Sequence, residues 1–198
     1  MDQKMRVAIV GAVFALLALA VVSYSATNKE SLPVIKEIGG GFSLVGEGGK
    51  PITLEDFRGS VVMLTFGFTT CPDICPTTLF SLKRLRAKLG DAAKDFKVIF
   101  VTLDPERDSP DHTAAYAGHF GPGVVGLGGN MQAIKETADR YKTKFFKKPI
   151  EGGEGAYTIA HSDFMYLLDA QGRTRAIYHH NDPLENIVAD AQKLLDEI

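Results

Sequence analysis

The chain opens with an unbroken apolar stretch, and only after it do apolar and polar positions alternate as in a folded domain. The stretch covers residues 7–22, follows Lys4 and Arg6, and holds neither charge nor proline. Its length approaches the roughly 20 residues that a helix needs to cross a bilayer. A helix without a polar face is not typical of a soluble core. We therefore predict a transmembrane anchor over residues 7–26, behind a short cytoplasmic flank over residues 1–6.

A cleaved signal peptide is the alternative interpretation of this segment, because Ser23 and Ser25 flank Tyr24 where a signal peptidase would cut. The apolar run is longer than a usual signal core, which favours an uncleaved anchor. Under either interpretation the rest of the chain is exported. With the basic flank inside, we expect a single-pass protein of the bacterial inner membrane whose soluble domain lies in the periplasm. Residues 27–41 are polar and glycine-rich, and we predict a tether there.

The remaining residues, 42–198, show the two periodicities of a mixed α/β domain. The continuous apolar run at 61–68 suits a strand buried on both faces. Leucines from 79 to 89 recur at helical spacing until Gly90. We predict a hairpin from 42–45 and 50–54, further strands at 96–103, 124–127, 157–159, 163–168 and 174–178, and helices at 77–89, 110–120, 131–141 and 183–195. This order is the thioredoxin-like fold, enlarged by the N-terminal hairpin and an insertion.

Charge and composition exclude one broad class of partner. The chain has 22 basic and 24 acidic residues, a formal net charge of −2, and no run of basic residues beyond Lys147 and Lys148. A protein that neutralises many phosphates needs a concentrated basic face. We therefore expect no nucleic-acid partner.

The two cysteines, Cys71 and Cys75, follow a predicted buried strand and open a predicted helix. A helix N-terminus lowers the pKa of a thiol, and two thiolates one turn apart can bind one soft cation. A structural disulfide would close a very small loop and stabilise little. A redox-active dithiol remains the alternative, although thioredoxin-like reductases have two residues between their cysteines and this chain has three. A thiol peroxidase is disfavoured, because Phe68 replaces the usual threonine and no third cysteine exists.

His161 stands apart from the other histidines because it comes directly before the predicted strand 163–168. In a thioredoxin arrangement the loop into this strand faces the start of the cysteine helix. A cis-proline occupies that place in thioredoxin, and here no proline precedes the strand. Two thiolates and one imidazole suit Cu(I) and can accept Cu(II), whereas a structural zinc site needs a fourth ligand. We predict a copper site formed by Cys71, Cys75 and His161.

Three other polar positions carry weaker signals. His179 and His180 are adjacent on a predicted strand, so they should point to opposite faces and lie at the surface. Asp104 ends a buried strand near the expected opening of the site. It fits either a helix-capping turn or a residue that steers a partner or tunes the thiols.

These segments together resemble the SCO/SenC family, over about residues 40–198 and in the N-terminal anchor. The likeness rests on FGFTTCPDICP at 66–76, VTLDPERD at 101–108, and His161 with Ser162 before an apolar strand. The resemblance implies a thioredoxin-fold copper-binding protein used to assemble cytochrome c oxidase, with Cys71, Cys75 and His161 as ligands. It also implies that Asp73 and Asp104 help to recognise the partner. Ala160 departs from the acidic residue that many members carry before the histidine, which puts fine tuning of the site in doubt.

Two functional hypotheses follow from these residues. The first is a metallochaperone that delivers Cu(I) or Cu(II) to the dinuclear copper site on the copper-binding subunit of a respiratory cytochrome c oxidase. It would depend on an upstream copper donor or thiol reductant. The alternative is a thiol–disulfide oxidoreductase that reduces the copper-ligand cysteines of the oxidase or signals redox state. We favour the carrier over the enzyme; a binding module with incidental cysteines would not explain three motifs in order.

Overall fold

A five-stranded sheet forms the centre of the protein in the computed structural model, which describes residues 31–151 and 155–198. The order is β5-β4-β3-β8-β9. The first three strands run parallel, and β8 and β9 are antiparallel to their neighbours. The bounds are β3 (Val61–Gly67), β4 (Phe96–Thr102), β5 (Val124–Leu127), β8 (Phe164–Leu168) and β9 (Thr174–His179). The mixed α/β, thioredoxin-like arrangement predicted from the element order is confirmed.

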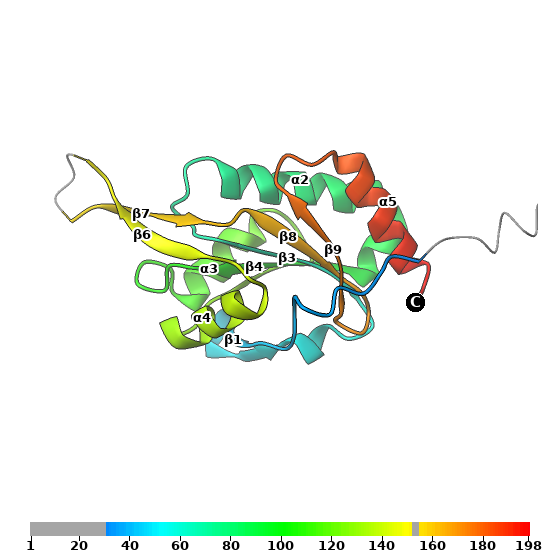
Figure 1. Cartoon of the computed structure of the whole chain (residues 1–198), viewed down its shortest axis with the longest axis horizontal. Coiled ribbons are helices and arrows are strands. Elements are labelled where there is room, and N and C mark those ends of the chain that lie inside the picture. The colour runs from blue at the N-terminus through cyan, green and yellow to red at the C-terminus, as the bar shows by residue number, and fades with distance from the viewer. Residues whose placement is uncertain (1–30, 152–154) are drawn as a thin grey trace, which may run out of the picture. The chain divides into compact units, whose positions relative to one another are not determined.

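Helices cover the sheet because their apolar stripes need burial. In Figure 1, α2 (Ile74–Lys88) and α5 (Leu184–Leu195) lie on the same side of the sheet. The leucines that predicted α2 are its buried face, and Leu79, Leu82 and Leu85 are fully enclosed. The helix begins three residues before the predicted Thr77, so Pro76 lies in its first turn. Proline is tolerated there because the first N–H groups of a helix have no intrahelical partner.

The other side of the sheet holds α4 (Met131–Arg140) and the predicted N-terminal hairpin of β1 (Ser43–Val45) and β2 (Pro51–Thr53) (Figure 1). Next to β5 lies α3 (Pro110–Gly118). A polar side chain caps the start of each of these two helices: Ser109 accepts a hydrogen bond from the His112 N–H, and Asn130 accepts one from the Ala133 N–H. Short 3-10 turns complete the domain at η1 (Glu47–Gly49), η2 (Leu54–Phe57) and η3 (Gly90–Asp95).

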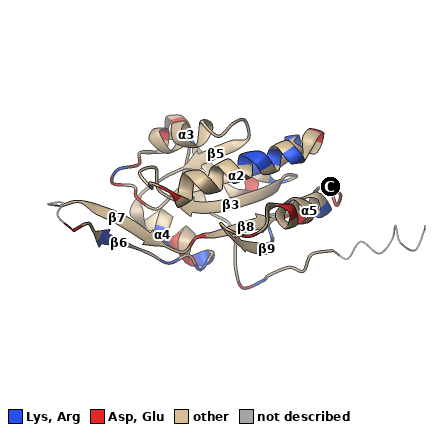
Figure 2. Cartoon of the chain, turned by 90° about the horizontal axis from the view of Figure 1, so that it is seen from above, with Lys and Arg blue, Asp and Glu red and all other residues tan. Residues whose placement is uncertain are grey.

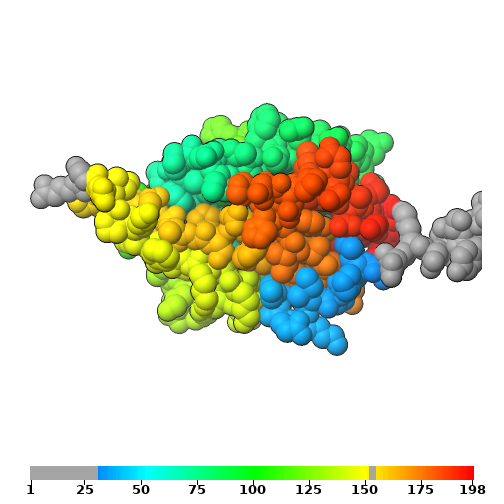
Figure 3. All heavy atoms as spheres, turned by 45° about the horizontal axis from the view of Figure 1, so that its top comes forward, coloured from blue at the N-terminus to red at the C-terminus, as the bar shows by residue number. Residues whose placement is uncertain are grey.

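The insertion is an antiparallel hairpin of β6 (Phe145–Pro149) and β7 (Tyr157–His161), which forms a sheet of its own. The sequence did not predict β6, because its lysines and exposed positions lack the alternation of a half-buried strand. In the space-filling view of Figure 3, β6 (yellow) extends from one end of the domain. The predicted strand at 157–159 is longer than expected and includes His161.

The predicted tether is bound to the domain along its described part. Leu32–Ile198 form one compact unit, and the Ile35 and Gly39 N–H groups donate to the Thr174 and Arg140 carbonyls. The predicted flank over 1–6 and anchor over 7–26 lie outside the described residues. Within residues 31–151 and 155–198, the structure contains no helix both long and apolar enough for a membrane crossing.

Candidate metal centre

The two thiols lie side by side where β3 leaves the sheet and α2 begins. Cys71 is half-buried in the turn, and Cys75, the second residue of the helix, is 4% exposed. Both cysteines are free. The Cys75 N–H points at the Cys71 Sγ at 3.5 Å. Gly67 leaves room for the Cys75 thiol against β3, because a Cβ there would lie 2.7 Å from the Cys75 Sγ.

The thiol pair is strongly polarised. The pKa of Cys71 falls from 9.0 to about 5, chiefly because the Cys75 thiol donates a hydrogen bond to it, with help from the N–H groups of Asp73 and Cys75. The same hydrogen bond and burial raise the pKa of Cys75. Cys71 is therefore a thiolate at neutral pH, and Cys75 keeps its proton until a metal or an electrophile displaces it.

The charge pattern of α2 supports this thiolate. No acidic residue lies in the first turn of the helix, whereas basic residues gather in its second half (blue in Figure 2). They are Lys83, Arg84, Arg86 and Lys88. Positive charge at the C-terminus complements the helix dipole. At the N-terminus the Cys71 sulfur is the anion that the dipole stabilises.

His161, the last residue of β7, turns its imidazole toward the thiols. Its Nδ1 lies 2.7 Å from the Ser162 carbonyl oxygen. Because a carbonyl only accepts, Nδ1 donates the hydrogen bond, and Nε2 is the ring nitrogen that faces the thiols. The Nε2 lies 4.0 Å from the Cys75 Sγ, and the ring meets Phe68 edge-on at 6.1 Å. Folding thus brings together the three residues predicted as ligands.

The spacing between sulfur and nitrogen is close to what one bridging metal ion requires. Metal–sulfur and metal–nitrogen bonds of about 2.3 Å and about 2.0 Å, as for zinc, would separate the donors by about 4.3 Å at most. The observed 4.0 Å between Cys75 and His161 fits a metal between them at a wide angle. In the part of the chain that the structure describes, no group of three His, Cys, Asp or Glu side chains is placed so that it could hold a metal ion without some movement.

A surface cavity of about 340 Å³ opens directly beside these donors. One wall is the cysteine turn with Cys71, Asp73 and Ile74, and the other is β7 up to His161. The Asp73 side chain is exposed and makes no capping hydrogen bond to the helix. The carboxylate therefore stands at the rim of the opening.

Asp104 follows β4 and is 1% exposed. Its carboxylate accepts hydrogen bonds from the Tyr157 hydroxyl at 2.9 Å and from the Arg107 side chain. The sequence left two interpretations of Asp104 open, a helix-capping turn or a residue that steers a partner or tunes the thiols. Neither of them includes a contact with the inserted hairpin. Tyr157 gave no signal of its own in the sequence.

Asp108 is a second buried carboxylate that the sequence analysis did not single out. It is 1% exposed and accepts hydrogen bonds from the Thr69 N–H at 2.9 Å, the Thr69 hydroxyl and the Thr102 hydroxyl at 2.7 Å. These bonds fix the turn that leads to Cys71. Its place in the DPERDSP segment, at the end of a buried strand, was the only available signal.

The prediction that His179 and His180 point to opposite faces is wrong. Both Nδ1 atoms contact the Asp163 carboxylate, at 3.2 Å and 2.5 Å. The alternation of a strand no longer applies because β9 ends at His179 and His180 lies in the following turn. Both rings are partly exposed, with side-chain accessibilities of 53% and 31%.

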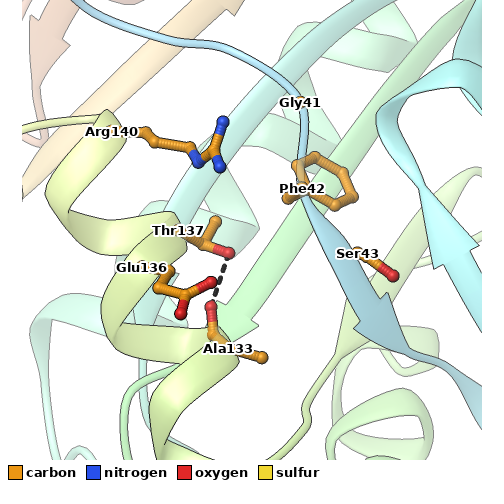
Figure 4. Close-up of a pocket in the computed structure, with 7 residues that line it drawn as sticks. All are labelled: Gly41, Phe42, Ser43, Ala133, Glu136, Thr137 and Arg140. Carbon is orange, nitrogen blue, oxygen red and sulfur yellow. Dashed lines mark hydrogen bonds between the residues drawn. The ribbon is translucent and has the colours of Figure 1, made fainter.

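A second cavity, of about 310 Å³, lies between the start of β1 and α4 (Figure 4). Arg140 extends into it toward Gly41, and the Thr137 hydroxyl donates within the helix to the Ala133 carbonyl. None of its lining residues is a cysteine or histidine. It therefore adds no soft metal donor to the candidate site.

The fold and the site define a thioredoxin-like domain with a polarised thiol pair at a helix start and an imidazole facing it. The chain belongs to the SCO1/SenC family, whose family model matches residues 32–196. A SCO2-like protein of Rickettsia conorii is 35% identical over 150 residues, which are 75% of this chain and 73% of that protein.

Solved structures agree with this assignment. Copper-bound ScoI of Bradyrhizobium japonicum matches with a TM-score of 0.71 and 33% identity, over 79% of this chain and 99% of that one. Copper-bound ScoI of Arabidopsis thaliana matches with a TM-score of 0.74 and 32% identity, over 81% and 99%.

Proposed function

We propose that this protein is a copper metallochaperone that binds one copper ion through Cys71, Cys75 and His161. The observation that carries the proposal is the 4.0 Å approach of the His161 Nε2 to the Cys75 Sγ, beside the Cys71 thiolate. Two sulfurs and one imidazole form a soft donor set that suits Cu(I) and tolerates Cu(II). Membership of the family and the copper-bound relatives support copper as the cargo.

Each ligand has a distinct task in loading. Cys71 is already a thiolate and makes the first bond, whereas Cys75 must lose the proton that it shares with Cys71. Binding therefore releases a proton. His161 would bind through Nε2, because Nδ1 donates to the Ser162 carbonyl and Nε2 faces the Cys75 thiol.

Delivery would use the open cavity beside Cys71. A partner that presents its own thiolates can displace the ligands one at a time, without the copper ion becoming free. We propose the copper-binding subunit of cytochrome c oxidase as this partner, with its dinuclear copper site as the destination. The exposed carboxylate of Asp73 at the rim is proposed to contact it. An anchor over residues 7–26 would hold the domain on the periplasmic side of a bacterial inner membrane.

The test is a copper titration of the reduced protein, followed by metal analysis. We expect one copper per chain, and none retained tightly by Cys71→Ser or Cys75→Ser. His161→Ala should lose most of its Cu(II) affinity, while its thiols still form a disulfide. His119→Ala, which removes an exposed histidine at the end of α3, is the matched control. Unchanged copper binding in His161→Ala would remove the third ligand from the proposal.

The polarised thiols also support thiol–disulfide exchange as a second function. The Cys71 thiolate would attack a disulfide of the partner and form a mixed disulfide, releasing one partner thiolate. Cys75 would lose its proton and attack Cys71, which leaves a Cys71–Cys75 disulfide and a partner with two thiols. The pair is oxidised by two electrons and the partner reduced by two. For this second function, His161→Ala should retain activity and Cys71→Ser should abolish it. Copper binding, in contrast, should be impaired by both substitutions.

A further inference from the structure

The hairpin that carries His161 is fastened to the domain at its far end by Tyr157. The Tyr157 hydroxyl donates a hydrogen bond of 2.9 Å to the Asp104 carboxylate, across 53 residues of chain. Asp104 is 1% exposed, so the acceptor end of the hydrogen bond is shielded from water. This pair joins the first residue of β7 to the end of β4.

Strand geometry connects this fastening to His161. Side chains of a strand alternate between its faces, so Tyr157, Ile159 and His161 share one face of β7. Ile159 is buried, which shows that this face turns toward the body of the domain. Five residues of strand place Tyr157 and His161 about 13 Å apart. A short, straight element held at one end sets the direction of the side chain at the other.

The domain side of the contact is rigid. The Asp104 N–H donates to the Thr102 hydroxyl at 3.0 Å, and the Asp104 carbonyl accepts from the Arg107 and Asp108 N–H groups. The Arg107 guanidinium pairs with the Asp104 carboxylate, donates to the Tyr157 carbonyl at 3.0 Å and lies 4.0 Å from the Tyr157 ring centroid. This arginine therefore grips the strand and the carboxylate together.

A second cation reinforces the contact from the neighbouring strand. Lys147 of β6 lies 4.4 Å from the Tyr157 ring centroid and forms an ion pair with Glu106. Cations over an aromatic ring attract its face. Both strands of the hairpin are thus tied to the loop that follows β4. At the base of the hairpin, the Ser162 N–H donates to the Lys144 carbonyl at 2.9 Å.

We propose that Tyr157 and Asp104 are positioning residues, which latch the β6–β7 hairpin to the loop after β4 and so hold the His161 imidazole against the thiol pair. This inference rests on the proposed function, in which His161 is a copper ligand. It assigns Asp104 a role inside the protein, distinct from the partner recognition that the family resemblance implied. Neither residue touches the metal.

The test is a double-mutant cycle read by Cu(II) titration of the full chain. Tyr157→Phe removes only the hydroxyl. We expect it to lower Cu(II) affinity by about tenfold when His161 is present, as for loss of a hydrogen bond to a buried carboxylate. In the His161→Ala background the same substitution should change affinity less than about twofold, because no ring remains to be positioned. Equal losses in both backgrounds, or no loss in the first, would overturn the proposal.

Tyr178→Phe is the matched control. It breaks another tyrosine–carboxylate hydrogen bond, 2.8 Å to Asp190, on β9 and away from the thiols. We expect comparable effects of the two substitutions on unfolding, but a change in the copper electron paramagnetic resonance spectrum only for Tyr157→Phe. A change of the same kind in Tyr178→Phe would mean a general structural effect and would refute the latch.

A metal-free measurement separates this inference from the proposed function. Amide hydrogen exchange in β6 and β7 should accelerate in Tyr157→Phe and not in Tyr178→Phe. If the wild type binds no copper, the proposed function fails while the exchange experiment still decides whether Tyr157 fastens the hairpin. Unchanged exchange in Tyr157→Phe would refute the latch whatever the metal result.

Discussion

The Nε2 of His161 lies 4.0 Å from the Sγ of Cys75, although 86 positions separate them in the chain. The sheet explains this approach. Strand β8 is antiparallel to β3, with Met165 opposite Thr65, so β8 begins where β3 ends. The residues just before β8 therefore meet the turn just after β3. The donor set is a consequence of strand order.

Gly67→Ala tests how closely β3 must approach the thiols. The added Cβ would lie 2.7 Å from both the Cys75 Sγ and the Phe100 ring. We expect a loss of about 1–3 kcal/mol in unfolding free energy from overpacking, together with weaker copper binding because Cys75 is displaced. Urea unfolding and copper titration measure the two effects. Gly118→Ala, where nothing lies within 4 Å, should be neutral or slightly stabilising.

The ionisation of Cys71 predicts a distinctive pH profile for alkylation. Its pKa falls from 9.0 to about 5, so its reaction with iodoacetamide should stay near its maximum at neutral pH and fall to half of that maximum near pH 5. Because the folded-state pKa is depressed, the thiolate stabilises the fold fully above pH 9.0, and this contribution is lost as the pH falls toward 5. Cys75→Ala removes the main donor, so the alkylation profile should move to higher pH. An unshifted profile in that variant would refute the hydrogen bond as the cause.

Asp108→Ala tests the clamp on the cysteine turn, by which we mean the hydrogen bonds from Thr69 and Thr102 to the Asp108 carboxylate. Without the carboxylate, the donors on Thr69 and Thr102 lose their acceptor, at a partly buried and a fully buried position respectively. Leaving buried donors unpaired costs about 1–3 kcal/mol, which urea unfolding should detect. The exposed Asp91→Ala should stay within about 0.5 kcal/mol of wild type. Equal stability of the two variants would show that the clamp is dispensable.

Arg175→Met addresses stability far from the thiols. Arg175 is 4% exposed, pairs with Asp169 and Glu197, and donates to the Leu32 carbonyl. Removing one partner of a buried ion pair costs about 3–5 kcal/mol, and we expect the lower end because Arg173 still pairs with Asp169. Thermal or urea unfolding measures this, and copper binding should not change.

Arg173→Met is the control for this change, because the wild-type Arg173 also pairs with the Asp169 carboxylate but its side chain is 51% exposed. Exposed ion pairs contribute about 0–1 kcal/mol. A loss as large as that of Arg175→Met would contradict the importance of burial.

Most of the sheet and the helices could be predicted because their residues are buried in long runs. The apolar stretch of β3 indicates a buried strand, and the spacing of the leucines of α2 indicates a helix. His161 could be placed near the thiols from the thioredoxin order alone. The start of α2 was predicted three residues too late, at Thr77, because the prediction did not allow for a proline in the first turn of the helix.

Residues that act through distant contacts were beyond the sequence. Asp104 was located at the right end of its strand, but its partner Tyr157 belongs to a hairpin whose first strand has no clear apolar pattern. Likewise, His179 and His180 converge on Asp163 because a strand ends between them, a boundary that periodicity does not fix to one residue. Contacts between polar side chains depend on such details more than burial does.

The separate sheet of β6 and β7 has a consequence for how the proposed carrier would release copper. The nitrogen donor is borne by an appendage, whereas both sulfurs belong to the central framework. In the proposed carrier, movement of this hairpin would break the bond from copper to His161 and expose Ile159, while the pairing of the five central strands is kept. If copper is released in this way, the contacts that hold the hairpin would set how readily the ion leaves, and the pairing of the central strands would set whether the domain stays folded.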